Sequence, residues 1–252
     1  MATCENRAAN SDAIPPLEMV SNELDIERLR ALLRAHGRLQ VPAFLQEDAA
    51  VRLHACLRDE VPWEASQRAD AGAIVGQSPT APPGSDEDAA LLETVTRRAR
   101  DGFEFYFDRY RMVEAYRDGL DPGLLLHSVL AFLNSPTFIE FARYLTGDPA
   151  IRMVSAMAVR YRQGHFLRLH HDRTTEEDRA FAYVMNLSPE WKPDWGGLLE
   201  FLDPGERRVV ETYTPHWNSL SLFRVPQAHQ VSLVAPWALA PRYSITGWFR
   251  RN

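Results

Sequence analysis

The sequence predicts an α+β fold in which a mainly helical amino-terminal half packs against an antiparallel core of short strands, as in a jelly roll. Apolar residues recur at helical spacing in several segments before Gly147. After Gly147 the pattern changes to short runs of β-branched and bulky residues, separated by Gly, Pro and polar turns. No helical pattern lies between these runs, so the strands should pair in a closed or double-sheet antiparallel core.

The length predicts one domain. A chain of 252 residues can bury one complete core, so we expect residues 21–252 to fold together. Residues 21–148 should provide mainly helical support, and residues 149–252 should form the β core. Residues 1–20 are polar and include two prolines, so we expect them to be a disordered lead-in.

The composition excludes several classes of protein. Hydrophobic residues make up 45% of the chain and charged residues 25%, which is typical of a folded globular protein. The formal net charge of -6 gives no overall attraction to nucleic acid. Cys4 and Cys56 are the only cysteines, too few for a disulfide framework or a Cys-rich zinc site. No run of 18 apolar residues and no signal peptide is found, so we expect a cytoplasmic protein with no membrane or nucleic-acid partner.

The expected helices follow from apolar spacing and from their start and stop signals. A first helix begins near Ser21 and stops at Gly37, and a short extended segment follows at 39–44. Residues 72–87 concentrate Gly, Pro, Ser and Asp, which predicts an exposed loop that could act as a lid. The other helices are expected at 47–58, 88–100, 122–133 and 136–145.

The expected strands occupy most of the carboxyl-terminal part of the chain. Gly196 and Gly197 favour a bulged strand start over a phosphate-binding loop, because the lysine and helix start of a nucleotide site are missing. The strands are expected at 151–162, 181–187, 198–202, 208–213, 219–224, 230–234 and 243–250.

A candidate metal site begins with His170 and Asp172, two residues apart at the end of a predicted strand. Side chains two apart on a strand point to the same face, so both could hold one ion. His229, on a distant strand, could supply a second imidazole. Two neutral nitrogens and one carboxylate leave three positions open, which suits Fe(II) that must bind a co-substrate and O₂. The His-x-Asp pattern alone is common by chance, and only the ordered set of later residues makes a metal site the better interpretation.

Arg242 follows His229 by thirteen residues and has a chemical reason to lie in the same cavity. A guanidinium can neutralise the distal carboxylate of 2-oxoglutarate with two parallel charge-assisted hydrogen bonds. Ser244 shares its strand face and could donate a further hydrogen bond, and Thr246 is a weaker candidate on that face. For a single arginine taken alone, a surface ion pair would be the ordinary interpretation.

Other polar and aromatic residues have simpler structural interpretations. His171 should point away from Asp172, because strand pleating selects His170 instead. We expect His165 and His216 to be structural or surface groups. Hydrogen-bonding or packing roles in the barrel are expected for Asn186, Trp195 and Trp248.

The stretch from about Pro136 to the carboxyl end resembles the prolyl 4-hydroxylase-like branch of the 2-oxoglutarate and Fe(II)-dependent oxygenases. The resemblance is carried by Tyr161-x-x-Gly164-x-Phe166-Leu167-x-x-His170-x-Asp172, Tyr183-Val-Met-Asn186, Trp191, Gly196-Gly197, His229-Gln-Val231 and Arg242-x-Ser244-x-Thr246-x-Trp248. It implies a double-stranded β-helix, the fold also found in cupins, with iron bound by His170, Asp172 and His229.

The resemblance also implies which residues bind the co-substrate. Arg242 should contact 2-oxoglutarate, and Tyr161 matches a tyrosine that lines the co-substrate pocket in relatives. One position departs from the pattern, because Val184 stands where some prolyl hydroxylases have a second tyrosine. The distal carboxylate should then depend on Arg242 with Ser244 or Thr246.

The reaction implied by the resemblance is hydroxylation coupled to oxidative decarboxylation of 2-oxoglutarate to succinate and CO₂. It requires Fe(II) and O₂, and ascorbate should support it. Asp172 favours hydroxylation, because halogenating relatives replace this carboxylate with a small residue.

The substrate is expected to be a prolyl residue in a protein or peptide. A free amino acid or another small metabolite is the alternative. A nucleic-acid demethylase ranks lower, because Trp248 stands where a second arginine would be expected. A cupin-like binding protein without turnover is the remaining alternative.

Overall fold

The computed structural model describes residues 19–68, 74–77 and 80–252. Its helices are α1 (Ile26–His36), α2 (Glu47–Asp59), α3 (Asp86–Asp101), α4 (Met112–Asp118), α5 (Leu125–Leu133), α6 (Pro136–Thr146) and the short 3-10 helix η1 (Pro193–Trp195). Its earlier strands are β1 (Arg38–Val41), β2 (Glu64–Arg68), β3 (Ile74–Gln77), β4 (Phe105–Tyr110), β5 (Met153–Val154), β6 (Met157–Tyr161) and β7 (Phe166–His170). Its later strands are β8 (Arg179–Asn186), β9 (Leu199–Leu202), β10 (Val209–Tyr213), β11 (Ser219–Arg224), β12 (His229–Val231) and β13 (Arg242–Arg250).

Capping residues set the ends of the helices. Asp25 precedes α1, and its carboxylate accepts a hydrogen bond from the backbone N–H of Arg28 at 3.0 Å. Gly37 ends this helix with a φ of 71°, a left-handed conformation that glycine adopts without steric cost. Ser135 caps α6 in the same way as Asp25 caps α1, and Pro136 stands in its first turn.

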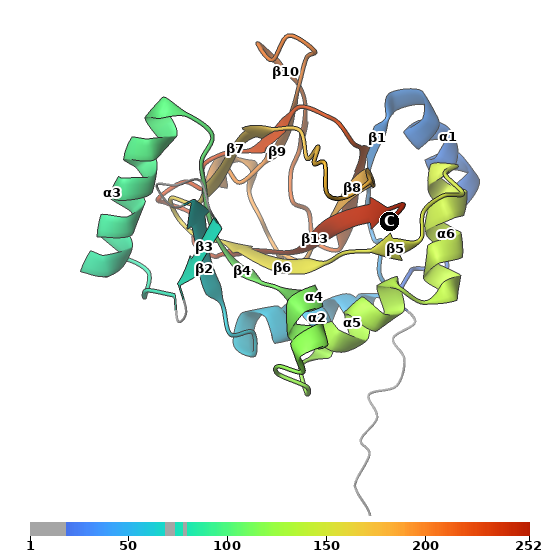
Figure 1. Cartoon of the computed structure of the whole chain (residues 1–252), viewed down its shortest axis with the longest axis horizontal. Coiled ribbons are helices and arrows are strands. Elements are labelled where there is room, and N and C mark those ends of the chain that lie inside the picture. The colour runs from blue at the N-terminus through green and yellow to red at the C-terminus, as the bar shows by residue number, and fades with distance from the viewer. Residues whose placement is uncertain (1–18, 69–73, 78–79) are drawn as a thin grey trace, which may run out of the picture.

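The strands form one antiparallel sheet that curls into a nearly closed barrel (Figure 1). From one edge to the other, the strand order is β1, β11, β8, β13, β6, β4, β7, β12, β9 and β10. Strand β4 joins the two walls of the barrel, because Tyr110 pairs with β6 whereas Phe105 pairs with β7. The edge strands β1 and β10 are linked by an ion pair between Arg38 and Glu211. This arrangement confirms the double-stranded β-helix core.

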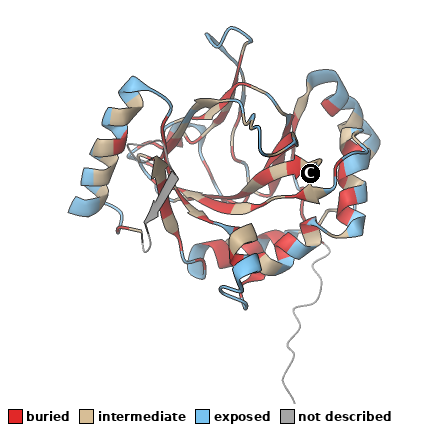
Figure 2. Cartoon of the chain, viewed as in Figure 1, coloured by how far each residue is buried: buried red, intermediate tan, exposed pale blue. Residues whose placement is uncertain are grey.

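The helices pack against the barrel from outside. In Figure 1, α2, α4 and α5 lie below the barrel, α1 and α6 lie to its right, and α3 lies to its left. The main hydrophobic core fills the space between helices and sheet, and it includes Leu53 of α2, Leu126 of α5 and Ile245 of β13. Figure 2 shows buried residues on the barrel strands and exposed residues on the outer sides of the helices. The inner face of the sheet is therefore left for a cavity.

The amino-terminal half contains more strand than the sequence analysis expected. Strands β2, β3 and β4 were not predicted, and β4 occupies a central place in the sheet. The loop prediction for residues 72–87 was wrong at 74–77, which form β3 paired with β2, and at 86–87, which begin α3. Residues 72, 73, 78 and 79 lie outside the described residues, so the lid hypothesis is not tested. The predicted strand at 151–162 is divided into β5 and β6.

Of the lead-in expected at residues 1–20, only Met19 and Val20 are described. Met19 is buried in the main core, and Val20 forms an isolated bridge with Leu45. No single helix among the described residues is long and apolar enough to cross a membrane, although α5 and α6, bent by 56° at the break between them, meet the length and composition criteria together.

Candidate active site

Two neighbouring strands bring His170 and His229 together inside the barrel. His170 ends β7, His229 begins β12, and the two residues lie directly opposite each other in the antiparallel pair. Their ring centroids are 4.1 Å apart. The Asp172 carboxylate completes the group, with one oxygen 3.3 Å from His170 Nε2 and the other 3.5 Å from His229 Nε2. All three potential ligand atoms lie within 4.8 Å of one another.

Asp172 reaches this position by a different route from the one expected. Strand β7 ends at His170, so Asp172 lies beyond the strand and does not share its face through pleating. Its φ of 59° is in the left-handed region, which aspartate tolerates better than most residues. Arg179 donates a hydrogen bond to the Asp172 backbone oxygen at 3.3 Å and stacks on the Trp248 ring at 3.5 Å. A backbone turn, held from β8, therefore aims the carboxylate at the imidazoles.

Each imidazole is oriented by a bond from its other nitrogen. Nδ1 of His170 lies 2.9 Å from the Arg168 carbonyl, and Nδ1 of His229 lies 2.7 Å from the Gln227 carbonyl. A carbonyl can only accept, so both Nδ1 atoms carry the proton and both Nε2 atoms present a lone pair to the centre of the group. This tautomer is the one that a metal ion requires.

Burial and charge favour the ligand forms of His229 and Asp172. Burial lowers the pKa of His229 to about 4, so this imidazole is neutral near pH 7. Burial raises the pKa of Asp172, but its contacts with His170 and His229 lower it by more, and the net pKa lies below the ordinary range. Two neutral nitrogens and one carboxylate thus converge with room for further ligands. This donor set fits Fe(II).

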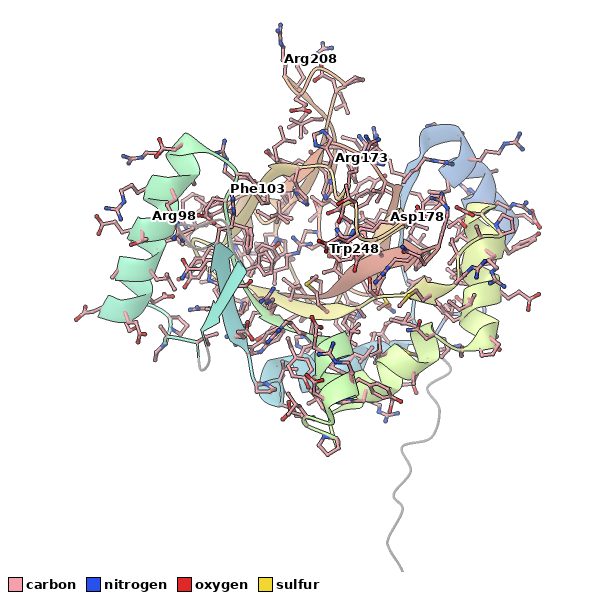
Figure 3. All side chains as sticks on the ribbon, in the orientation of Figure 1. Arg98, Phe103, Arg173, Asp178, Arg208 and Trp248 are labelled. Atoms are coloured by element: carbon pink, nitrogen blue, oxygen red, sulfur yellow. The ribbon has the colours of Figure 1, made fainter. Side chains whose placement is uncertain are left out.

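The triad opens into a cavity of about 290 Å³ inside the barrel. Its walls are mainly apolar and include Phe105 and Phe107 of β4 together with Phe103, which precedes this strand. Phe103 lies 5.8 Å from the His170 ring, centroid to centroid. In Figure 3, Phe103 lies on the α3 side of the barrel, Trp248 lies on β13, and Arg208 marks the tip of the β9–β10 hairpin that projects beyond the barrel. The cavity can therefore hold a small anion beside the triad and admit an apolar group from outside.

Arg242 lines the same cavity and is only 2% exposed. Its guanidinium donates to the backbone oxygen of Gly197 at 2.7 Å and to Asn186 Oδ1 at 3.3 Å. It also lies 5.2 Å from the centroid of the Tyr161 ring. Burial lowers the pKa of Arg242 to about 10, so the group remains charged at pH 7. No carboxylate of the described residues forms an ion pair with it, which leaves a buried cation facing a cavity.

The other expected co-substrate residues also line this cavity. Tyr161 of β6 pairs in register with Arg242, so the two side chains lie at the same depth. Ser244 is buried two residues further along β13. The Thr246 hydroxyl donates to the Tyr183 carbonyl at 2.7 Å, so its proton is already used. Val184, the position that departs from the family pattern, lines the cavity as an apolar wall.

Neighbouring histidines lie away from the triad. His171 Nε2 lies 2.9 Å from a carboxylate oxygen of Glu206, outside the group formed by His170, Asp172 and His229. His165 is buried against Tyr106, with ring centroids 4.3 Å apart, and it does not line the cavity. These placements agree with the structural roles expected for both histidines.

Sequence reasoning missed the aromatic wall and Arg179. The wall had a detectable signal, since Phe103, Phe105 and Phe107 alternate with other residues at the spacing of a strand. The Arg179 contact with Asp172 had no such signal, because it depends on the backbone turn after β7.

Comparisons with known proteins agree with this geometry. Residues 156–250 match the model of the 2OG-Fe(II) oxygenase superfamily. The chain is 29% identical over 157 residues to prolyl 3-hydroxylase OGFOD1 of Mus musculus, a match that covers 59% of this chain and 28% of that protein. It is 32% identical over 123 residues to prolyl 3-hydroxylase OGFOD1 of Xenopus laevis, covering 44% and 23%. The chain therefore spans only about a quarter of the length of these relatives.

Solved structures show the same fold. An oxidoreductase of the 2OG-Fe(II) oxygenase family from Burkholderia pseudomallei superposes with a TM-score of 0.59 and 19% identity, covering 92% of this chain and 93% of that one. A Trichoplax adhaerens prolyl hydroxylase, in complex with a peptide fragment of the hypoxia inducible factor oxygen degradation domain, superposes with a TM-score of 0.57 and 17% identity. This match covers 90% of this chain and 89% of that one. With the family match over residues 156–250 and the sequence likeness to prolyl 3-hydroxylases, these comparisons support a 2OG-Fe(II) oxygenase that is similar to prolyl hydroxylases.

Proposed function

We propose that this chain is a 2-oxoglutarate- and Fe(II)-dependent dioxygenase that hydroxylates a prolyl residue in a protein or peptide. One observation carries the proposal. A single cavity holds both a triad of the type that binds Fe(II) and a buried guanidinium that no carboxylate of the described residues neutralises. An anion that reaches from the iron to Arg242 would satisfy both groups, and 2-oxoglutarate has a chelating end and a distal carboxylate.

The residues would divide the work as follows. His170, Asp172 and His229 would hold the iron, which supplies O₂ activation coupled to decarboxylation of 2-oxoglutarate to succinate and CO₂. Arg242 would bind the distal carboxylate with charge-assisted hydrogen bonds, and the buried Ser244 hydroxyl is placed to add another. The surrounding apolar walls exclude water and strengthen these electrostatic contacts.

The cavity lining supports a prolyl residue within a chain. The phenylalanine wall offers apolar contacts to a pyrrolidine ring. A free amino acid would also bring an ammonium group into the site. The only carboxylate among the described lining residues is Asp172, and the iron would occupy it. A prolyl residue flanked by neutral amides avoids this cost, and both sequence relatives are named prolyl 3-hydroxylases, which supports carbon 3 as the oxidised position.

A turnover assay tests the proposal. The purified protein is incubated with Fe(II), 2-oxoglutarate, O₂ and ascorbate, and succinate is measured with and without a library of proline-containing peptides. Succinate release should rise with a substrate peptide, and mass spectrometry should find one added oxygen on its proline. The variant His170→Ala should lose both signals, whereas His171→Ala, a change at the neighbouring histidine outside the triad, should keep them.

The same assay separates the alternatives. Oxygen added to a free amino acid, but to no peptide, would support the small-metabolite alternative. A protein that binds Fe(II) yet never releases succinate would support the cupin-like binding protein. Omission of ascorbate should slow repeated turnover if ascorbate supports the enzyme.

A further inference from the structure

Among the described residues, only neutral groups hold Arg242 in the cavity. Its guanidinium donates to the Gly197 carbonyl at 2.7 Å and to the side-chain oxygen of Asn186 at 3.3 Å. Asn186 is itself 2% exposed, so water does not replace it as a partner. Both acceptors are dipoles, which can orient a cation without cancelling its charge.

Two serine hydroxyls of β11, on the side of Asn186 away from Arg242, set the orientation of its amide. The Ser219 hydroxyl donates to the His216 carbonyl at 2.8 Å, so its oxygen is left to accept from Asn186 Nδ2 at 3.2 Å. Gln40 Nε2 lies 3.3 Å from the Ser221 hydroxyl, and Asn186 Nδ2 also reaches that hydroxyl at 3.5 Å. The amide nitrogen is therefore directed to the serines of β11. Its oxygen must then face Arg242.

The geometry points to Asn186 as a positioning residue that aims Arg242 into the cavity and keeps its positive charge available for the second carboxylate of a dicarboxylic 2-oxoacid. This inference rests on the proposed function, because it concerns how the co-substrate is selected. An aspartate at this position would have nearly the same shape, but its negative charge would neutralise the guanidinium from behind. A 2-oxoacid with a single carboxylate would be affected far less, because it has no group that reaches Arg242.

The test is binding of two ligands to Asn186→Asp. The protein is loaded with Mn(II), a metal chosen because it does not support turnover. It is then titrated by calorimetry with 2-oxoglutarate and with pyruvate, which lacks the distal carboxylate. We expect the dissociation constant for 2-oxoglutarate to rise about tenfold or more, equivalent to about 1.4 kcal/mol. The dissociation constant for pyruvate should change by less than about twofold. Asn134→Asp, which changes an asparagine that binds the Leu130 and Val154 carbonyls outside the cavity, is the matched control and should change neither ligand.

A second variant tests the inference if Asn186→Asp does not fold. Ser219→Ala removes the acceptor that directs the amide but adds no charge, and it should weaken 2-oxoglutarate binding about threefold with pyruvate unchanged. Equal losses for both ligands in Asn186→Asp would indicate a general structural effect and overturn the inference. Unchanged 2-oxoglutarate binding in Asn186→Asp, or in Ser219→Ala when Asn186→Asp does not fold, would overturn it as well. If the unmutated protein with Mn(II) does not bind 2-oxoglutarate, the proposed function itself fails.

Discussion

Replacing Arg242 with methionine should separate ligand binding from stability. The change removes the guanidinium and keeps a long apolar side chain in the cavity. The distal carboxylate of 2-oxoglutarate would lose two charge-assisted hydrogen bonds, which contribute about 1.5 kcal/mol each at the lower end of their range. The total of about 3 kcal/mol corresponds to a loss of about 100-fold in affinity.

The stability of the ligand-free protein should change little. Gly197 and Asn186 each lose a donor in this variant, at about 1–3 kcal/mol per unsatisfied acceptor. Removal of a buried, unneutralised charge offsets this by a similar amount, several kcal/mol. For a domain of this size, about 1 kcal/mol shifts the Tm by about 2–4 °C. We therefore expect the Tm of Arg242→Met to lie within about 4 °C of the unmutated value.

A thermal-shift assay with Mn(II) measures both quantities. At a 2-oxoglutarate concentration of 100 times Kd, the unmutated protein should gain about 2.7 kcal/mol, which is about 5–10 °C. The variant at the same concentration should gain only about 0.4 kcal/mol, or about 1 °C. An equal ligand-induced shift in both proteins would refute the assignment of Arg242 to the distal carboxylate. A large fall in the Tm without ligand would refute the view that its charge is uncompensated.

Three further changes test the surrounding structure. Gly196→Ala should destabilise the fold by about 3 kcal/mol or more, because Gly196 has a φ of 67° and a Cβ there would lie 2.0 Å from the Leu233 carbonyl oxygen. In the control variant Gly205→Ala the new Cβ would have no neighbour closer than 3.9 Å, so the denaturant midpoint of unfolding should stay nearly unchanged. Burial lowers the pKa of His165 from 6.5 to about 4, so the unfolded chain binds a proton more readily than the folded protein does. The free energy of unfolding should therefore fall by about 3 kcal/mol as the pH drops from 6.5 to 4. His165→Phe should flatten this part of the pH profile, and an unchanged profile would contradict the burial effect. His229→Ala should lose stoichiometric Fe(II) in anaerobic equilibrium dialysis, and full retention of iron would remove this histidine from the proposed site.

The ordered motifs could be found in the sequence because each residue type has a chemical reason to be there. His170, His229 and Arg242 were recognised from residue type and order, and the structure places all three at one cavity. The reasoning for Asp172 was wrong in its geometry, because a left-handed turn after β7 brings it to His170 and strand pleating does not. A sequence pattern describes regular elements, whereas a turn of this kind is fixed by tertiary contacts such as the one from Arg179.

Two parts of the structure lay beyond this kind of sequence reasoning. Strand β4 follows the end of α3, and its place between β6 and β7 depends on long-range pairing that local propensity does not report. The neutral support of Arg242 by Asn186 and Gly197 was equally hidden, because Arg242 lies 45 residues from Gly197 and 56 from Asn186 in the chain and meets them only when the barrel closes. The fold class was predictable from the pattern of apolar residues along the chain, and the polar contacts inside the barrel were not.

A crystal structure of the protein with Mn(II) and 2-oxoglutarate, collected at the manganese absorption edge, tests the central proposal most directly. We predict one anomalous peak within about 2.3 Å of an Nε2 atom of His170, an Nε2 atom of His229 and a carboxylate oxygen of Asp172. The far carboxylate of 2-oxoglutarate should lie within hydrogen-bond distance of the Arg242 guanidinium. A metal peak elsewhere, or a ligand whose far carboxylate does not approach Arg242, would contradict the proposal.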